Sequence, residues 1–409
     1  MKKLRAVLLV LCVLLALTVL GGAAAEEAVS VNGQCAFTVK GASRKEIKKL
    51  TDGKYSDYVS IRKGGEIGVD GKGTPLGSVL VQFYDRAAEV EIWARVGDEW
   101  VLAGRIGEYL SGWVPLPEGA EALRVVNTDK SRMLVADMTV YGTGERPANS
   151  PEWETYDKAD LLVAACHPDD ELLWLGGLLP TYAGERGLRV QVVYAVPSTP
   201  VRRLELLDGL WHCGVKGYPA FLNLPDAFTK TMKAAYGRWG KNKMHSRMTA
   251  VIRRYRPEVV VTHDLNGEYG HGGHEAVADT VVKAVQYAAN GEKYTDSAKQ
   301  YGTWQVKKLY LHLYEAQPIQ FDWHRPLAAF GGKDGLTVAT EALALHRSQT
   351  ARGWEMEDGG PMDNSRFGLA FSAVGLDEAC DDLFEHVWPT ELEETETEEA
   401  AESEEDSDV

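Results

Sequence analysis

Basic residues are scarce in this chain. Its 409 residues include 44 Lys and Arg against 60 Asp and Glu, which gives a formal net charge of −16. Nucleic-acid binding calls for a basic stripe, so nucleic acid is not an expected partner. Residues 389–409 hold eleven of the acids and no base, and this low-complexity segment is predicted to be a disordered tail. It either solvates the chain end or captures cations or a basic wall component.

Long apolar runs are missing after the first 25 residues. The chain starts with the basic segment Met1–Arg5, continues with the apolar run Ala6–Leu20 and reaches Ala25 through small residues. This order predicts that residues 1–25 are a secretory signal peptide, and hence a secreted protein with cell-surface association left open. The alternative is an uncleaved membrane anchor, for which the apolar run is short.

Cysteines are few and widely spaced. Removal of the signal peptide would leave Cys35, Cys166, Cys213 and Cys380. Four cysteines allow three full pairings, but this spacing does not resemble a disulfide framework. We expect mostly free, buried thiols, with Cys166 in a core strand.

Histidine is absent from about residue 29 to residue 144, which excludes histidine-based metal chemistry there. Apolar and polar residues alternate at Val79–Phe83, Val90–Val96 and Ala122–Val126. Such short strands between Gly, Asp and Pro clusters predict an antiparallel β-sandwich over residues 26–147. Residues 148–157 are predicted to be a linker.

The pattern changes after residue 157, where strand-like and helix-like segments alternate. This alternation predicts an α/β domain over residues 158–388, with a Rossmann-like, largely parallel sheet. Sites in such sheets form beyond the carboxyl ends of the strands. The predicted strands are 161–166, 190–196, 221–224, 259–262 and 308–313, and the predicted helices are 172–185, 202–213, 244–255 and 274–288.

Two polar clusters follow predicted strands. His167-Pro-Asp-Asp-Glu171 comes after the first strand, and a Gly-rich loop from His263 to His274 comes after a later one. His167 and Asp170 are three residues apart, as are His271 and His274, so each pair can share one side of a helical turn. Two histidines, one carboxylate and an open position are typical of catalytic zinc. The alternative is that the acids only cap a helix.

These two motifs make residues 157–385 resemble the PIG-L/LmbE family of zinc-dependent N-deacetylases. The resemblance implies a Rossmann-like fold, with His167, Asp170 and His274 as metal ligands and Asp169 as the general base. A protonated His271 would lie by the oxyanion with Tyr269. The implied substrate-binding residues are Arg202, Asp226 and His346. Arg202 in an ion pair with Glu205 and Asp226 as a turn residue remain alternatives.

One departure from the family pattern concerns the second loop. Many members have Pro-Asp between the two loop histidines, whereas this chain has Gly272 and Gly273. The missing Asp leaves the orientation and protonation of His271 open, with Glu268 or Asp264 as substitutes. The other histidines, including His312, are expected to be core or surface residues.

The N-terminal region resembles discoidin-type (F5/8 C-like) modules at Leu50–Tyr55, Arg124–Thr128 and Met138–Gly144. That resemblance implies carbohydrate binding, with Trp93 and other tryptophans as stacking or core residues. We therefore expect a secreted, zinc-dependent deacetylase of an N-acetylglucosamine-type amino sugar, acting on a glycoconjugate or cell-wall glycan. Another divalent metal, another N-acyl substrate and a non-catalytic carbohydrate-binding protein remain alternatives, and the oligomeric state is open.

Overall fold

The computed structural model describes residues 26–40 and 42–388. The predicted signal peptide at residues 1–25 and the predicted acidic tail at residues 389–409 lie outside the described residues. The chain divides into two compact units between Ser150 and Pro151, within the segment predicted as a linker. Among the described residues, no helix has the length and apolarity needed to cross a membrane.

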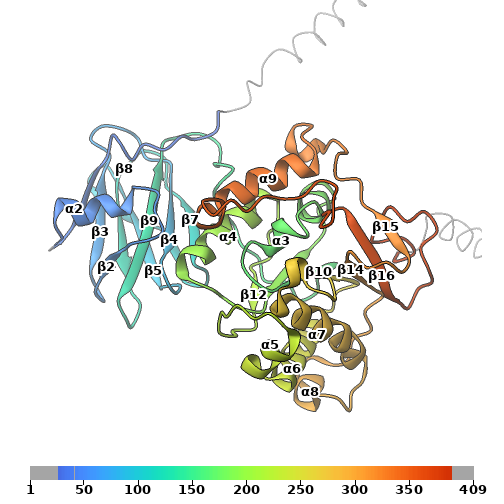
Figure 1. Ribbon diagram of the computed structural model, residues 1–409. Coiled ribbons are helices and arrows are strands. Elements are labelled where there is room, and N and C mark those ends of the chain that lie inside the picture. Colours follow the sequence, from blue (N-terminus) through green and yellow to red (C-terminus); the bar gives the residue numbers. More distant parts are fainter. Residues whose placement is uncertain (1–25, 41, 389–409) are drawn as a thin grey trace, which may run out of the picture. The chain divides into compact units, whose positions relative to one another are not determined.

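The first unit consists of two antiparallel sheets, ordered β1-β3-β8-β5-β6 and β2-β9-β4-β7 (Figure 1). The three strands predicted here are confirmed as β4, β5 and β8. Alternate residues of β5 are buried, as expected where one face of a strand meets the core. The strands are β1 Ala36–Val39, β2 Val59–Ile61, β3 Glu66–Asp70, β4 Ser78–Phe83, β5 Val90–Val96, β6 Glu99–Ile106, β7 Ser111–Pro115, β8 Ala120–Asn127 and β9 Met133–Tyr141, and the helical turns are α2 Arg44–Ile47 and η1 Lys48–Leu50.

The second unit is built on a seven-stranded sheet with the order β12-β11-β10-β13-β14-β16-β15. The neighbouring strands β12, β11, β10, β13 and β14 run parallel to one another, and β16 and β15 pair antiparallel at the end of the sheet. The predicted largely parallel α/β sheet is therefore confirmed. The strands are β10 Leu161–Ala165, β11 Val190–Tyr194, β12 Ala220–Phe221, β13 Val259–Thr262, β14 Lys308–His312, β15 Pro318–Gln320 and β16 Arg366–Ser372.

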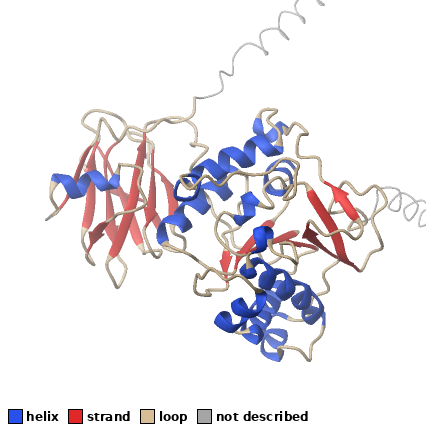
Figure 2. Ribbon diagram, viewed as in Figure 1, coloured by secondary structure: helices blue, strands red, loops and turns tan. Residues whose placement is uncertain are grey.

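Helices connect these strands (Figure 2). Three of the four predicted helices are confirmed as α4, α6 and α7. The helices and helical turns are α3 Asp170–Leu173, η2 Pro180–Glu185, α4 Pro200–His212, α5 Met232–Trp239, α6 Lys241–Tyr255, η3 Glu268–Gly270, α7 Gly272–Ala289, α8 Thr295–Tyr301, η4 Ala328–Phe330, α9 Gly335–Leu345 and α10 Arg347–Thr350.

The helix predicted over residues 172–185 is wrong as a single element. The structure has the short helix α3, a turn and then the π-helical segment η2. Gly176 and Gly177 lie in the turn, and a Cβ at Gly177 would come within 2.5 Å of the Trp323 ring. Glycine is a poor helix former, and Pro180 lacks the N–H that a continuous helix needs.

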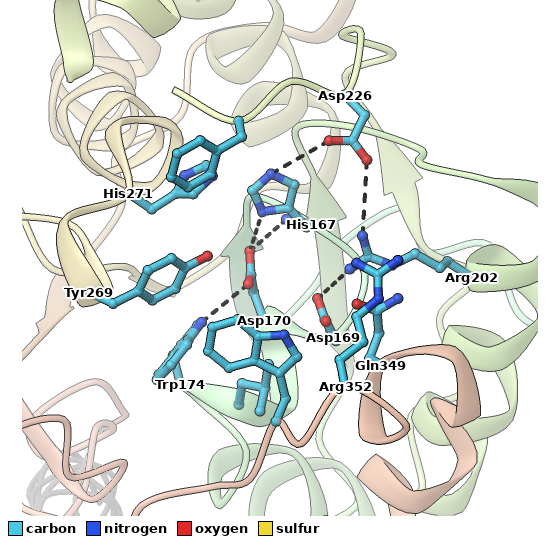
Figure 3. Close-up of a pocket in the computed structure, with 13 residues that line it drawn as sticks. His167, Asp169, Asp170, Trp174, Arg202, Asp226, Tyr269, His271, Gln349 and Arg352 are labelled. Atoms are coloured by element: carbon cyan, nitrogen blue, oxygen red, sulfur yellow. Dashed lines mark hydrogen bonds and ion pairs between the residues drawn. The ribbon is translucent and has the colours of Figure 1, made fainter. Parts of the chain in front are cut away.

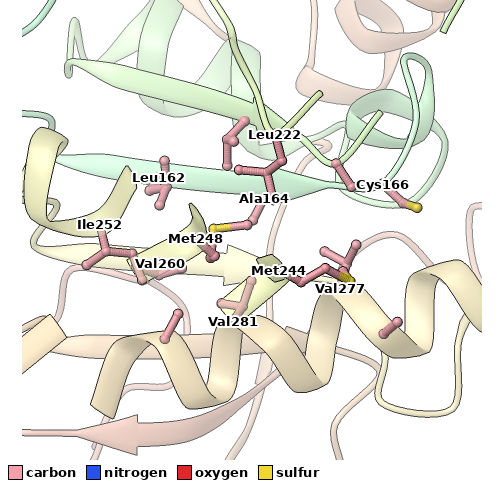
Figure 4. Packing of buried hydrophobic residues seen from close by; sticks show 14 of the residues in the cluster. Leu162, Ala164, Cys166, Leu222, Met244, Met248, Ile252, Val260, Val277 and Val281 are labelled. Carbon is pink, nitrogen blue, oxygen red and sulfur yellow. The ribbon is translucent and has the colours of Figure 1, made fainter. Parts of the chain in front are cut away.

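The core of the second unit lies between the sheet and helices α6 and α7 (Figure 4). Leu162 and Ala164 of β10 and Val260 of β13 face Met248 of α6 and Val281 of α7, and all five are buried. Because β11 and β13 flank β10 on opposite sides, the chain reverses its direction of winding beside β10. Ligand sites in open α/β sheets form at such switch points.

Candidate active site

The HPDDE motif forms a tight turn between β10 and α3. The Asp169 backbone has φ of 117°, a left-handed conformation that L residues rarely adopt. Non-glycine residues held in such regions cost about 1–3 kcal/mol and are common at functional sites. Two side chains secure the turn: Asp170 Oδ2 accepts the His167 N–H at 2.7 Å, and Glu171 Oε2 accepts the Asp169 N–H at 2.8 Å. The capping role is thus real for Glu171, but Asp170 has further contacts.

Three ligand-type atoms meet where this turn faces the loop after β13. His167 Nδ1 lies 3.0 Å from Asp170 Oδ2, His274 Nε2 lies 3.3 Å from the same oxygen, and the two nitrogens are 3.4 Å apart. Atoms that ligate one tetrahedral zinc ion at about 2.0 Å lie about 3.3 Å from one another. All three residues are buried, so this donor set fits a zinc-type cation in both chemistry and spacing.

A buried carboxylate, Glu268, organises the histidines behind this set. Its Oε2 lies 2.7 Å from His274 Nδ1 and 2.8 Å from His263 Nδ1, and its Oε1 lies 2.9 Å from His312 Nδ1. Although burial disfavours a charged carboxylate, these histidines hold the pKa of Glu268 well below its usual range. A donated Nδ1–H fixes the His274 ring so that Nε2 faces His167 and Asp170.

Sequence reasoning missed this network. The sequence pattern indicates Glu268 only as a substitute partner for His271, whereas Glu268 contacts His274. It predicts His312 only as a core or surface residue, whereas His312 contacts Glu268. His263 Nε2 also accepts the N–H of Cys166, which ties the second loop to the end of β10 at 2.9 Å. The position of Glu268, six residues before His274 in a loop of histidines, was the available signal.

His271 is the N-cap of α7, and its Nδ1 accepts the Gly273 N–H at 3.0 Å. A neutral ring bonded in this way carries its proton on Nε2. Burial and the neighbouring His274 and His167 lower the pKa of His271 to about 3. The hydrogen bond from Gly273 favours a neutral His271 that carries its proton on Nε2, whereas the expectation stated with the family resemblance is a protonated ring.

The Gly-Gly departure has a steric reason. A Cβ at position 272 would lie 2.3 Å from the backbone carbon of Thr231, so the segment 229–231 approaches the loop as closely as glycine allows. The Gly272 N–H also donates to the Thr229 carbonyl at 2.8 Å, a bond that proline cannot make. This approach brings Phe228 against the His271 ring, with centroids 4.9 Å apart.

Asp169 lies beside the donor set and pairs with Arg202. Asp169 Oδ1 is 2.6 Å from Arg202 Nη2, which also donates to the Pro168 carbonyl. Burial raises the pKa of Asp169 to about 7 even though Arg202 opposes the shift. A carboxyl group whose pKa lies near the working pH can both accept and return a proton. Arg202 therefore contacts Asp169, rather than the expected alternative partner Glu205, which binds Ser348.

A cavity of about 180 Å³ opens over these groups (Figure 3). Asp226 lies on its wall, 4.0 Å from both His167 Nε2 and Arg202 Nη1. The Tyr269 hydroxyl points toward Asp170 in Figure 3, and the residue is 42 % exposed. The lining residues are His167, Asp169, Asp170, Leu173, Trp174, Arg202, Asp226, Phe228, Tyr269, His271, Gln349, Arg352 and Trp354.

Three aromatic rings form one side of this cavity. Trp174, Tyr269 and Trp354 contact one another with centroids 5.3–6.3 Å apart. Aromatic faces of this kind supply a large apolar surface on which the C–H face of a ring-shaped ligand can pack. Trp174 lies three residues after Glu171, so its place beside the HPDDE motif was an available signal, whereas Trp354 comes from a segment far from both motifs.

His346 does not reach the cavity wall, although it was expected to bind substrate. It is fully buried, and its Nε2 lies 3.3 Å from Glu171 Oε1, behind the HPDDE turn. Gln349, from the same motif, takes the place on the wall that was expected for His346.

Comparison with known proteins supports the predicted family resemblance over part of the chain. The family model PIG-L, described as GlcNAc-PI de-N-acetylase, matches residues 161–285. The 1D-myo-inositol 2-acetamido-2-deoxy-alpha-D-glucopyranoside deacetylase of Rhodococcus jostii is 31 % identical over 188 residues, covering 39 % of this chain and 63 % of the relative. The enzyme of the same name from Mycobacteroides abscessus is 31 % identical over 178 residues, covering 37 % and 58 %.

A solved structure was also matched. The N,N'-diacetylchitobiose deacetylase from Pyrococcus horikoshii has 17 % sequence identity and a TM-score of 0.37, with 47 % of this chain and 71 % of that chain covered. The chain spans about three fifths of the length of the curated deacetylases that it matches. Those homologues are deacetylases of N-acetylated glucosamine derivatives.

Proposed function

We propose that this protein is a metal-dependent hydrolase that removes the N-acetyl group from an N-acetylglucosamine-type amino sugar. The observation that carries the proposal is the triangle of His167 Nδ1, Asp170 Oδ2 and His274 Nε2, with sides of 3.0–3.4 Å, beside the cavity. Asp169, the candidate base, lines the same cavity. Amide hydrolysis needs the metal site and the base within reach of one carbonyl carbon.

His167, Asp170 and His274 would hold the metal, with zinc as the first candidate because of the His₂–carboxylate set. Such an ion lowers the pKa of water and polarises a carbonyl. The carboxylate of Glu268 would orient His274 from behind.

The other residues would move protons and stabilise charge. Asp169 would accept a proton from the attacking water and return it to the departing amine, for which its pKa of about 7 is suited. Neutral His271 would donate its Nε2–H to the developing oxyanion. Burial and Asp170 raise the pKa of Tyr269, so that its hydroxyl remains protonated and is a second donor.

The amino-sugar substrate is supported by the matched deacetylases and by the aromatic side of the cavity. Arg202 and Asp226 would contact sugar hydroxyls, as the family resemblance implies. We further propose that residues 1–25 direct secretion and that the first unit is a discoidin-like carbohydrate-binding module. Among the tryptophans of that unit, which were expected as stacking or core residues, Trp113 packs against the buried cluster of Ala28, Leu80 and Tyr141.

The test is acetate release from a panel of N-acyl compounds by the purified, metal-supplemented protein. The panel contains N-acetylglucosamine, N,N'-diacetylchitobiose, a glucosaminide with a longer acyl group and an N-acetyl amino acid. We expect acetate and a free amino sugar from the N-acetylglucosamine compounds, with loss of turnover on chelation. If the protein released acetate only from the N-acetyl amino acid, the proposed sugar substrate would be wrong and the substrate would be another amide.

A further inference from the structure

A second buried pair lies behind the HPDDE turn. The carboxylate of Glu171 and the imidazole of His346 are both fully buried. Glu171 Oε1 and His346 Nε2 are 3.3 Å apart. The Tyr194 hydroxyl also contacts Glu171, and His346 Nδ1 has no hydrogen-bond partner among the described residues. Unsatisfied buried polar groups cost free energy, so fold stability alone does not account for this cluster.

The other oxygen of Glu171 acts on the candidate base. Glu171 Oε2 accepts the N–H of Asp169 at 2.8 Å, at the residue whose backbone φ is 117°. A strained conformation persists only where its surroundings hold it. This hydrogen bond therefore fixes the direction in which the Asp169 carboxyl leaves the backbone.

His346 is itself held firmly in place. It ends α9 and packs so closely on α4 that a Cβ at Gly209 would lie 2.9 Å from its Nε2. Two residues later, Ser348 donates its N–H and hydroxyl to Glu205 of α4, at 2.9 and 2.5 Å. His346 thus connects Glu171 to a clamped segment, which continues to Gln349 on the cavity wall.

We propose that Glu171 and His346 form a buried positioning pair, which holds Asp169 in the strained conformation that aims its carboxyl at the reaction centre. The mechanistic part rests on the proposed function. Glu171 is a positioning residue because it reaches the reacting atoms only through Asp169.

Hydrophobic replacement separates positioning from stability. Replacing both members of a buried ion pair with apolar residues is often neutral or stabilising, so E171M/H346L should stay folded while Asp169 loses its hydrogen-bond acceptor. We expect kcat to fall by about 10- to 100-fold, with KM and zinc affinity unchanged within about twofold. E171M alone should have the same kcat as the double variant, because the pair acts as one unit.

A second readout does not depend on turnover. Hydrogen exchange at the Asp169 amide should be faster in E171M/H346L than in the wild type, and a crystal structure should show φ of Asp169 outside the left-handed region. If the wild type released no acetate from any compound, the proposed function would fail while these two measurements still tested the pair.

The matched control is D377N, which removes the negative charge from the buried contact of Asp377 with Lys308 and Tyr310, away from the cavity. It should lower Tm without lowering kcat. The proposal is overturned if E171M/H346L has wild-type kcat, or if exchange at the Asp169 amide is unchanged.

Discussion

The two loops that meet at the candidate site are built in different ways. The turn after β10 is short and strained, and it presents His167, Asp169 and Asp170 directly to the cavity. The loop after β13 places its carboxylate, Glu268, behind the histidines, where it is out of contact with the cavity. In the proposed mechanism the first loop would supply the proton-transfer group, and the second would fix the orientation of a metal ligand. Substitutions in the two loops should therefore fail in different ways.

The largest effect is expected from the first loop. Asp169→Asn removes the proton acceptor and keeps the shape of the side chain, so acetate release should fall by about 10²- to 10⁴-fold. Bound metal, measured by elemental analysis after dialysis, should remain at the wild-type level because Asp169 is outside the donor triangle. Unchanged turnover would remove Asp169 from the mechanism.

A smaller effect is expected from the second loop. Glu268→Gln keeps the shape of the side chain but removes its negative charge and replaces one carboxylate oxygen with an amide nitrogen. The contacts of the carboxylate with His274, His263 and His312 are thereby weakened. Zinc affinity, measured by competition with a chromogenic chelator, should fall about 10- to 100-fold. At saturating zinc most of the turnover should return. Loss of turnover with unchanged affinity would contradict the orienting role.

The smallest effect is on stability, and it tests the Gly-Gly departure. Gly272→Ala forces a Cβ against the Thr231 backbone, so the free energy of unfolding should fall by about 1–3 kcal/mol. The matched control is Gly237→Ala in α5, where the new Cβ meets nothing within 4 Å. That substitution should leave stability unchanged or raise it by up to about 1 kcal/mol. Chemical denaturation of both variants measures the difference.

The strands and the HPDDE turn could be predicted because their signals are local. Leu161–Ala165 is an apolar run followed by clustered acids, and parallel strands bring their carboxyl ends to one edge. The same logic placed the loop ending in His274 opposite the turn. The three ligand-type residues are in fact brought together, 3.0–3.4 Å apart.

What could not be predicted depends on contacts between distant segments. Glu268 and His312 are 44 positions apart in the sequence, and Glu171 and His346 are even farther apart. No local sequence pattern therefore predicts either contact. The break after α3 depends on Trp323 packing onto Gly177. Trp354 reaches the cavity only through the path of the chain after α10.

In the proposed function, the donor triangle of His167, Asp170 and His274 binds one metal ion. Calorimetric titration of zinc into the chelator-treated protein, with Asp170→Asn as the comparison, tests it most directly. We predict saturable binding of one ion per chain in the wild type and at least 100-fold weaker binding in Asp170→Asn, since a charged ligand is lost. Absence of saturable binding in the wild type, or equal affinity in the two proteins, would show that the triangle is not a metal site.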